Sequence, residues 1–354
     1  MSKIKKRVTI KDVAELAEVS IATVSRVLNN PDYKVSAAVQ QRVKDAVEKL
    51  GYVPNLAAQA LRNDDRQYRD IGVAIPNVTN QFYLQTLMGI DTVLSENKCN
   101  IILCNTMSDV KREHDFLYEL YHRRTLGVIL SSVDEDPDVI NKYIKKGMKF
   151  VLLDQKVSDV DCPCISYDSR AGARMAIEYL IRQGHRKIAF ATMPLTRWTR
   201  HQIHKGYREA MIESGRGYNE NLVYTAEVQE SDFQHVGEEV SVGRRIAEKF
   251  LKDGCPATAI FCNNDMLAIG LMQVLIKNGV NIPDDVSIIG FDDIPFAEAF
   301  YPALTTIRYP SVETGRLAAI IMLGYISKNK NFMTMDMHLT PRLVVRDTVK
   351  QIIS

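Results

Sequence analysis

The stretch from Thr9 to Asn29 constrains the fold of this chain more than any other segment. It opens with apolar residues three and four positions apart, a spacing that predicts a short helix with one buried face. These residues are Ile10, Val13, Ala14 and Ala17. Thr9 can cap this helix, with Asp12 three residues later. We expect the helix to end near Ala17.

A second short helix is predicted after a tight turn over Glu18–Ser20. Ser20 can cap it, and the helix should run from about Ile21 to Leu28. Its inward residues are Val24, Val27 and Leu28, and its outward residues are Ile21, Ala22, Thr23, Ser25 and Arg26. This arrangement is typical of a helix-turn-helix unit, whose second helix enters the major groove of DNA. An ordinary helical hairpin with a solvated face is the alternative.

The outward residues suit DNA chemically. Arg26 can donate hydrogen bonds to O6 and N7 of guanine, and Ile21 and Ala22 can contact a thymine methyl group. The hydroxyls of Thr23 and Ser25 suit phosphate oxygens. A third helix, capped by Ser36, should complete a three-helix unit that ends at Gly51–Pro54. Its inward residues are Val39, Val43, Ala46, Val47 and Leu50.

The charge distribution agrees with a DNA contact at one end. The 354-residue chain carries a net charge of only +2, but residues 1–63 hold eleven Lys and Arg against six Asp and Glu. A basic segment on a nearly neutral body is typical of a nucleic-acid contact confined to that segment.

Composition excludes several other classes. No apolar run reaches the roughly 18 residues of a membrane span, and no apolar signal core follows the basic N-terminus, so we expect a cytoplasmic protein without a membrane partner. Six dispersed cysteines indicate reduced thiols rather than disulfides or a metal site.

From Ile71 onward, short apolar strands alternate with amphipathic helices, which predicts parallel sheets covered on both faces. The predicted strands are Ile71–Ile75, Asn100–Cys104, Gly127–Leu130, Phe150–Leu153, Cys164–Tyr167, Lys187–Ala191, Thr258–Cys262 and Val286–Gly290. The predicted helices include Phe82–Asn97, Ala171–Gln183, Ile203–Ser214, Gly243–Lys252, Met266–Asn278 and Ser311–Ile326. A change in composition near Gln155–Pro163 predicts a division into two such units.

Many linked positions resemble the lactose-repressor (LacI/GalR) family of bacterial transcription regulators. In the N-terminal region they are Ile10–Ala14, Val19-Ser20, Thr23–Asn29, Val35-Ser36, Gly51-Tyr52, Pro54-Asn55, Ala58 and Leu61. In the body they are Ile71–Val73, Arg124, Gly127–Leu130, Asp168, Gly172, Gly184–Ile188, Asn264–Gly270, Ile282–Ser287, Gly290–Asp293, Leu304–Thr306 and Leu343–Arg346. One departure is Glu18, where the family often has glycine; a left-handed residue there would cost roughly 1 kcal/mol.

The resemblance implies an all-α helix-turn-helix headpiece over residues 1–54 and a hinge helix and linker over 55–70. Residues 71–354 would form an α/β, two-lobed, periplasmic-binding-protein-like domain for effector binding and dimerisation. The implied DNA-binding residues are Thr9, Ser20, Ile21, Ala22, Thr23, Ser25, Arg26, Asn29, Asn55, Ala58, Leu61 and Arg62. Leu61 would enter the minor groove as an apolar wedge, followed by Arg62. A plain linker with Leu61 packed on the body is the alternative.

The resemblance also implies an effector site between the lobes, at the carboxyl ends of the strands. Its predicted residues are Asn80, Phe82, Asp154, Arg200, Asn264 and Asp292. Loop capping is the alternative for the Asn and Asp residues, and cleft-edge packing for Phe82. Asp168 and Asp265 are predicted to cap the helices that they precede.

Two positions depart from the family pattern in the effector region. Ile203 stands where the family usually has an arginine, three residues before Gly206-Tyr207, and Gln81 stands where proline is common. Arg200 could supply the cation and Trp198 a stacking face, unless they lie on the surface. The ligand would then be an atypical sugar or an acidic or phosphorylated compound, or else the site has degenerated.

We therefore expect a repressor of carbohydrate uptake or catabolism genes that binds a pseudo-palindromic operator as a homodimer. Its effector would be a sugar or sugar derivative, with no cofactor or metal. The alternative is a two-lobed binding protein or enzyme on the same scaffold. However, no dinucleotide or phosphate-binding glycine motif follows a predicted strand, and His201-x-x-His204 alone is a weak metal motif. The tail after Val349 is too short for the leucine heptads of a tetramer.

Overall fold

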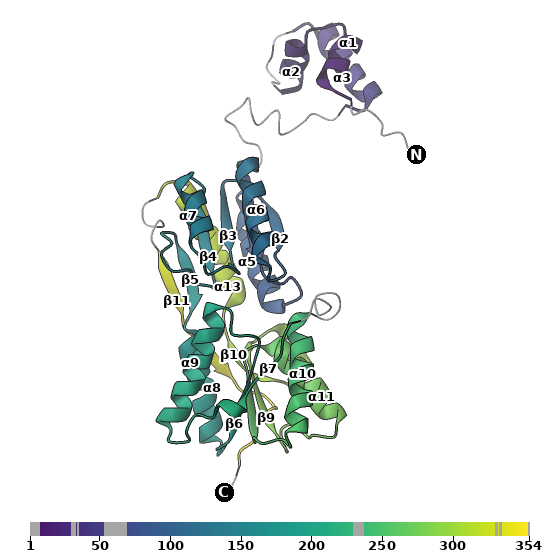
Figure 1. Cartoon of the computed structure of the whole chain (residues 1–354). Coiled ribbons are helices and arrows are strands. Elements are labelled where there is room, and N and C mark those ends of the chain that lie inside the picture. The colour runs from purple at the N-terminus through teal and green to yellow at the C-terminus, as the bar shows by residue number, and fades with distance from the viewer. Residues whose placement is uncertain are drawn as a thin grey trace. The chain divides into compact units, whose positions relative to one another are not determined.

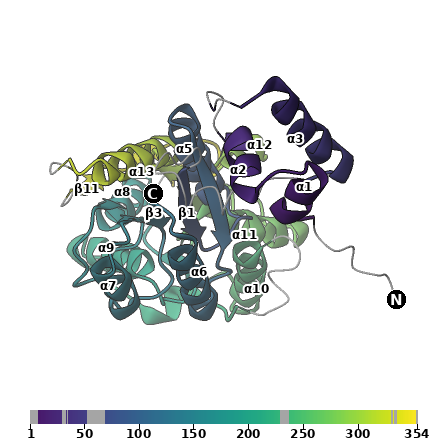
Figure 2. The same cartoon turned by 90° about the horizontal axis from the view of Figure 1, so that it is seen from above.

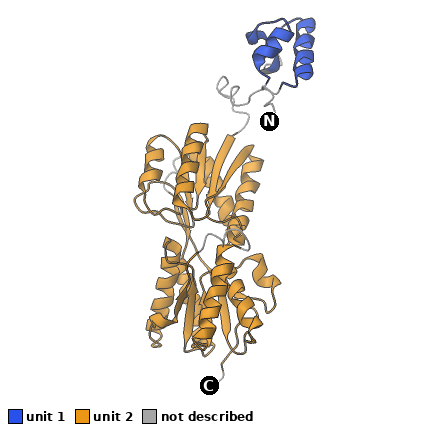
Figure 3. Cartoon of the chain, turned by 45° about the vertical axis from the view of Figure 1, so that its right-hand side comes forward, with its two compact units in different colours: residues 1–67 blue, residues 68–354 orange. Residues whose placement is uncertain are grey.

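The computed structural model describes residues 8–29, 33, 35–52, 69–228, 237–329, 332 and 335–352. The chain forms two compact units, residues 1–67 and 68–354 (Figure 3). The first is helical and the second contains all the described strands. In the described ranges, none of the helices is long and apolar enough to cross a membrane.

The first unit consists of α1 (Ile10–Leu16), α2 (Ile21–Asn29) and α3 (Ala37–Leu50). Its core holds one small set of apolar side chains from all three helices. They are Val13, Ala14, Ala17, Val24, Val43 and Ala46. The three-helix prediction is confirmed, with helix ends within about one residue of those expected.

The predicted caps of this unit are present. The Asp12 carboxylate accepts from the backbone N–H of Thr9 at 2.6 Å, and Ser20 Oγ accepts from the backbone N–H of Thr23 at 3.0 Å. Ser36 accepts from Val39 N–H at 3.4 Å. Glu18 takes the left-handed conformation with φ 54°, so the turn keeps its shape without the glycine common in the family.

The second unit contains two six-stranded sheets (Figure 1). The first sheet has the order β11-β5-β4-β3-β1-β2 and all its pairs are parallel. Its strands are β1 (Arg69–Ile75), β2 (Cys99–Asn105), β3 (Gly127–Leu130), β4 (Phe150–Leu153), β5 (Cys164–Tyr167) and β11 (Asp336–Leu339). The second sheet has the order β12-β10-β9-β8-β6-β7, with only β12 antiparallel. Its strands are β6 (Ile188–Thr192), β7 (Val223–Thr225), β8 (Ala259–Cys262), β9 (Ser287–Asp292), β10 (Thr305–Arg308) and β12 (Arg342–Val344).

Helices cover both sheets and define two lobes. The first-lobe helices are α5 (Gln81–Glu96), α6 (Val110–Arg123), α7 (Asp138–Lys145) and α13 (Ser311–Ile326). The second-lobe helices are α8 (Ser169–Arg182), α9 (Trp198–Glu213), α10 (Glu238–Lys252), α11 (Asp265–Lys277) and the short α12 (Pro295–Ala299), with one 3-10 turn at Glu220–Leu222. Helix α13 follows a second-lobe strand, yet it lies beside α5 (Figure 2). The two helices approach closely at Gly89, where an added Cβ would lie 1.9 Å from the Val312 carbonyl oxygen.

The chain crosses between the lobes three times, after β5, after β10 and after β11. The predicted division near Gln155–Pro163 is therefore wrong by one strand, because β5 pairs with β4 in the first sheet. β4 and β5 are adjacent parallel strands, and the loop that joins them is irregular and contains no helix. The change in composition marks that loop and not the lobe boundary.

Candidate DNA-reading helix and effector cavity

Helix α2 presents the face that the sequence predicts. Val24 is fully buried, whereas Ile21, Ala22 and Arg26 are exposed, Ile21 to 42%. Thr23 and Ser25 are half-buried. The helix thus offers two small or apolar side chains and one guanidinium on its open face, the set that direct reading of base edges requires.

Two contacts at this helix could not be predicted from the local sequence pattern. The Arg26 guanidinium carbon lies 5.5 Å from the ring centre of Tyr33, a cation–π distance that restrains the arginine. The hydroxyls of Ser20 and Thr23 lie 2.9 Å apart and hydrogen-bond to each other. Phosphate contacts by these hydroxyls would therefore extend an existing hydrogen bond.

The other predicted DNA-binding residues divide into two groups. The Thr9 hydroxyl donates to Asp12 at 2.6 Å at the start of α1. Asn29 is the last residue of α2, but its side chain is outside the described residues. The predicted contacts at Asn55, Ala58, Leu61 and Arg62 also lie outside the described residues.

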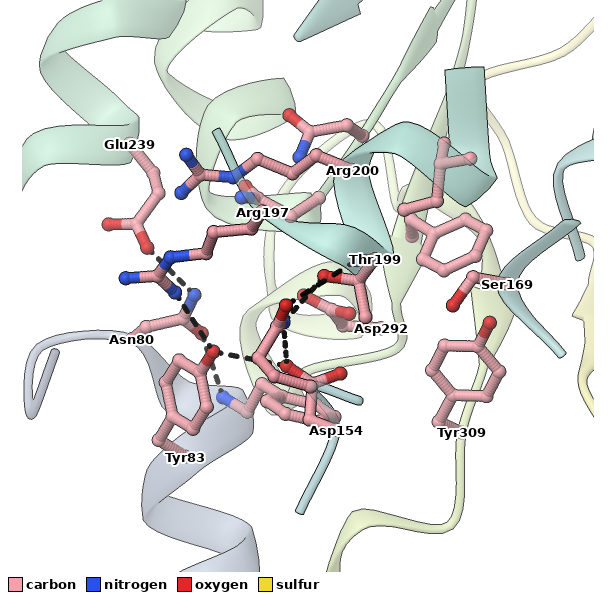
Figure 4. A pocket seen from close by; sticks show the side chains of 16 residues that line it. Asn80, Tyr83, Asp154, Ser169, Arg197, Thr199, Arg200, Glu239, Asp292 and Tyr309 are labelled. Carbon is pink, nitrogen blue, oxygen red and sulfur yellow. Dashed lines mark hydrogen bonds between the residues drawn. The ribbon is translucent and has the colours of Figure 1, made fainter. Parts of the chain in front are cut away.

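All six predicted effector residues line one cavity in the second unit, with about 60 Å³ of free space (Figure 4). Its walls come from both lobes, at or just beyond the carboxyl ends of β1, β4, β8 and β9. The predicted residues there are Asn80, Phe82, Asp154, Arg200, Asn264 and Asp292. Ile203 also lines the cavity. The lining residues that the sequence analysis did not assign are Tyr83, Gln155, Ser169, Arg197, Thr199, Glu239, Asn263, Phe291 and Tyr309.

Asp154 directly follows β4 in the left-handed conformation, with φ 64°. Its carboxylate accepts from Gln155 Nε2 at 2.8 Å and from the Tyr83 hydroxyl at 3.3 Å. Burial raises the pKa of Asp154, although these hydrogen bonds and the nearby Arg197 oppose the rise. A ligand hydroxyl could donate to the remaining lone pairs of this carboxylate.

Asp292 ends β9, and its side chain makes no hydrogen bond to the described residues. Burial, followed by the carboxylates of Asp265, Asp154 and Glu239, raises the pKa of Asp292 well above its ordinary value. The half-buried Asp292 side chain lines the cavity and could accept a hydrogen bond from a ligand hydroxyl there.

Asp265 does not cap α11, contrary to prediction. Asn264 takes that role, accepting from Leu267 N–H at 2.7 Å. Asp265 is fully buried and instead accepts from Ile294 N–H at 2.9 Å and from the Thr306 hydroxyl at 2.6 Å. Its carboxylate points into the sheet because the two donors that need an acceptor lie there, and it thereby fixes the turn after Asp292.

Two of the other predicted polar roles are clear. Asp168 caps α8, as expected, by accepting from Ala171 N–H at 2.9 Å. Asn80 lines the cavity and also caps α5, accepting from Phe82 N–H at 3.0 Å. Capping and cavity lining are thus compatible for Asn80 and Asn264, because each caps its helix through the amide oxygen alone; the NH₂ group of Asn80 donates to Glu239 at 2.9 Å.

Arg200 lies one helical turn before Ile203 on α9, and both line the cavity. Its one hydrogen bond within the described residues goes to the Pro194 carbonyl at 2.9 Å. Burial, and the neighbouring Arg197, lower the pKa of Arg200 to about 10. Trp198 is half-buried and is not part of the lining. The Arg200 side chain thus places a cation in the lining of a cavity to which Ile203 contributes none.

Protein groups hold the two lobes together around the cavity. Glu239, from α10, accepts from the side-chain amides of Asn77 at 2.8 Å and Asn80 at 2.9 Å. Arg197 donates to Ser108 Oγ at 2.8 Å, and Gln155 donates to the Thr199 hydroxyl at 2.6 Å. We call these contacts, with the Ser108–Glu238 hydrogen bond of 3.2 Å, the interlobe latch.

The cavity is small because the latch is closed. A buried water needs roughly 10–15 Å³ of such space, so about 60 Å³ holds a few waters rather than a sugar. Figure 4 shows Arg197, Arg200, Glu239 and Asn80 gathered at one side of the cavity and Ser169 and Tyr309 at the other. A sugar therefore needs more space than these side chains leave in this conformation.

Aromatic rings form the remaining wall. Phe82 packs edge-on against Tyr167 at 5.8 Å, and Tyr167 stacks on Tyr309 at 4.1 Å. Phe291 meets Tyr309 edge-on at 5.1 Å. The Tyr309 hydroxyl is buried without a hydrogen-bond partner within the described residues. It is a polar group available to a ligand beside a flat apolar surface.

Comparison with known proteins agrees with this architecture. Residues 9–55 match the model of bacterial regulatory proteins of the lacI family, and residues 177–349 match a periplasmic binding protein-like domain. The HTH-type transcriptional repressor PurR of Vibrio parahaemolyticus is 33% identical over 347 residues, which cover 97% of this chain and 99% of that protein. The chain belongs to the lacI family.

Two solved structures share the fold. The transcriptional regulator CelR in complex with cellobiose is 27% identical with a TM-score of 0.69, and the match covers 97% of this chain and all of that one. The lac repressor dimer bound to operator and the anti-inducer ONPF has a TM-score of 0.73 at 24% identity, over 98% of this chain and all of that one. This lacI-family chain is a DNA-binding transcriptional repressor with an effector domain, and its relatives are repressors rather than enzymes.

Proposed function

We propose that this repressor controls genes of carbohydrate uptake or catabolism and acts in the cytoplasm as a homodimer on a pseudo-palindromic operator. Residues 1–54 would read the operator, 55–70 would form the hinge, and 71–354 would bind a sugar or sugar derivative and pair the two chains. The observation that carries the carbohydrate assignment is the cavity, where unfilled hydrogen-bonding groups adjoin aromatic rings.

Each wall suits part of such a ligand. Asp154 and Asp292 offer acceptors for sugar hydroxyls, and Arg200 offers donors to ring or hydroxyl oxygens. The Tyr309 and Phe291 rings suit the apolar C–H face of a sugar. The cellobiose complex of CelR supports the same ligand class.

Ligand binding would control DNA binding through the latch. A ligand large enough to fill the space between Asp154 and Arg200 must alter the contacts of Glu239 and Arg197 across the lobes. The angle between lobes would then set the spacing of the two headpieces of a dimer. Such coupling is reciprocal and typically amounts to about 1–3 kcal/mol.

The DNA-reading role is tested by Arg26→Ala in a binding-site selection with the full chain. Loss of the Arg26 contact should relax the preference for guanine at one position of each half-site, at a cost of about 1–3 kcal/mol. Arg42→Ala is the matched control, because Arg42 is a half-exposed arginine on α3 paired with Glu18 at 3.7 Å. An unchanged preference in the Arg26 variant would refute the assignment.

The effector site is tested with a panel of neutral sugars, sugar acids and sugar phosphates. Any compound that raises the melting temperature is then titrated by calorimetry into Asp292→Asn and into Asp284→Asn, whose carboxylate is 79% exposed. We expect the affinity to fall at least tenfold in the first variant, since an amide NH₂ group would replace one of the two carboxyl oxygens that can accept from the ligand. Equal affinities in both variants would remove Asp292 from the site.

A further inference from the structure

The end of the first sheet at which its strands begin lies opposite the cavity. It carries a concentration of cations. All strands of this sheet are parallel, so they all begin at one end of the sheet and all end at the other, beside the cavity. Helices α5, α6 and α7 run back from the cavity edge and end where the strands begin (Figure 1). Helix α13 ends there too, because Met322 contacts the start of β3 at Gly127.

We call the charged residues at this end of the lobe the cationic edge. They occupy the strand starts and the turns that precede them. Its members are Arg69, Lys98, Arg123, Arg124, Lys145, Lys146, Lys149 and Lys328. The acidic residues at the same strand starts and turns are Asp70, Glu96, Asp161 and Asp336, of which Asp336 pairs with Lys156 at 3.0 Å. Lys98, Arg123, Lys145, Lys146 and Lys328 are all exposed.

The five exposed members of the cationic edge lack acidic partners among the described residues. Across the described ranges, Lys98, Arg123, Lys145, Lys146 and Lys328 have no carboxylate within ion-pair distance. The corresponding edge of the second lobe also has exposed lysines without an ion pair among the described residues, Lys187 and Lys252, but there Arg182 pairs with Glu178 at 4.0 Å and Lys350 with Asp284 at 3.7 Å. The mutual repulsion of the cations at the cationic edge can thus be offset only by solvent or by an external anion.

Helix dipoles explain only part of this pattern. Arg123 and Lys145 lie in the last turns of α6 and α7, where a cation is favoured by the helix dipole. Lys98 and Lys328 lie in turns after helices, both in left-handed conformation, and gain less from it. Lys146 sits 4.8 Å from the Tyr121 ring centre, which holds its ammonium group at the surface.

The polyanion that this chain meets is DNA. The headpiece is joined to β1 at this same edge, since Arg69 begins β1 and residues 53–68 precede it. The chain that leads from the headpiece therefore enters the second unit at the cationic edge.

We propose that the cationic edge is a second DNA contact, which binds phosphates flanking the half-site without reading sequence. It adds to the affinity that the headpiece supplies, for operator and for unrelated DNA alike. Its contribution is electrostatic, so it depends on the salt concentration through the release of counterions from DNA. Each phosphate that the protein neutralises adds about 0.9 to the magnitude of the slope of log K for DNA binding against log salt concentration.

The test uses the full chain with Lys98→Gln and Lys145→Gln combined. We expect the salt slope to decrease in magnitude by up to about 2, and affinity for operator and for a scrambled duplex to fall by the same factor. The matched control combines Lys187→Gln and Lys252→Gln, two exposed lysines at the strand-start edge of the second lobe. The control should leave the slope and both affinities at wild-type values.

A second measurement locates the contact. A duplex extended by about one helical turn beyond each half-site should bind wild-type protein more tightly than a duplex that ends at the half-sites. The cationic-edge variant should lose this gain. An unchanged salt slope, or an equal change in the control, would overturn the second contact. Failure of wild-type protein to select any operator would instead overturn the proposed reading by α2, so the two failures are distinct.

Discussion

At the scale of single residues, two aspartates with the same local pattern have different roles. Asp168 and Asp265 each stand at the start of a helix after a buried strand. Asp168 is exposed and caps its helix, whereas Asp265 is fully buried and binds Ile294 and Thr306. The difference depends on what lies across the sheet: Gly290, where an added Cβ would lie 2.1 Å from Asp265 Oδ1, leaves room for the buried carboxylate.

Asp265→Asn should destabilise the second unit by about 1–3 kcal/mol, because an amide NH₂ group would meet the Thr306 hydroxyl or the Ile294 N–H, both donors to Asp265. Urea unfolding measures this loss. The same variant should weaken effector binding, since the turn after Asp292 loses its anchor. Asp168→Asn is the control and should change stability by less than about 0.5 kcal/mol, because asparagine caps helices as well as aspartate does.

The cavity shows which residues sequence reasoning can and cannot find. Asp154 and Asp292 follow strands, so their position at the carboxyl edge is readable from the chain. Glu239 is not, because its place depends on α10 packing across the cleft from Asn77 and Asn80, more than 150 residues away in sequence. Tyr309 could not be predicted either, because it lines the cavity from the segment after β10, where the chain crosses between the lobes.

At the scale of elements, the start of α10 is the most heavily charged part of the interlobe latch. Glu238 and Glu239 are both buried there, next to each other. Glu238 accepts from Ser108, and Arg197 and Arg200 on α9 partly offset its burial. Burial, followed by the charge of Glu239, raises the pKa of Glu238 to about 7. We therefore expect closing of the lobes to be linked to binding of a proton.

The sign of this linkage follows from the raised pKa. Opening the lobes would return Glu238 to water and its pKa toward the ordinary value of 4.5, so the closed form binds protons more tightly. Closure should be favoured most below that ordinary value and should weaken as pH rises through about 7. Trp198, the one tryptophan of the chain, begins α9 beside Arg197 and can report the change by fluorescence.

We expect Trp198 emission of the ligand-free protein to titrate near pH 7 and to become flat between pH 6 and 8 in Glu238→Gln. Glu248→Gln, an exposed position on the same helix, should retain the wild-type curve. A flat wild-type curve, or the same titration in both variants, would show that Glu238 does not couple closure to pH.

At the scale of the whole molecule, the sequence predicts most strands because parallel strands buried on both faces are continuous apolar runs. β3, β4, β5 and α13 have the predicted bounds. The elements without a prediction are α6, α7, α12, β7, β10, β11 and β12. Several of these are short or partly exposed, so their apolar pattern is weak. The lobe boundary was also predicted wrongly, because it depends on the pairing of β5 with β4, which the composition of the chain does not reveal.

Exposed apolar side chains indicate where a second copy would pack. On the first lobe these include Met88 of α5, 64% exposed, and Leu103 on the edge strand β2. On the second lobe they include Phe296, Phe300 and Tyr301, at and just after α12, with Tyr301 92% exposed. Exposed apolar groups on both lobes are what a dimer formed through the body would cover.

Met88→Ser combined with Tyr301→Ser should therefore convert a dimer to a monomer in light scattering, while the melting temperature of the isolated chain should barely change, because both side chains are exposed there. Operator affinity should fall by at least tenfold, since each chain would then bind one half-site alone. Ile212→Ser is the control: Ile212 is an exposed apolar residue on α9, at 51%, away from α5 and α12 in sequence. A wild-type tetramer, or a dimer that survives the double substitution, would contradict pairing through these residues.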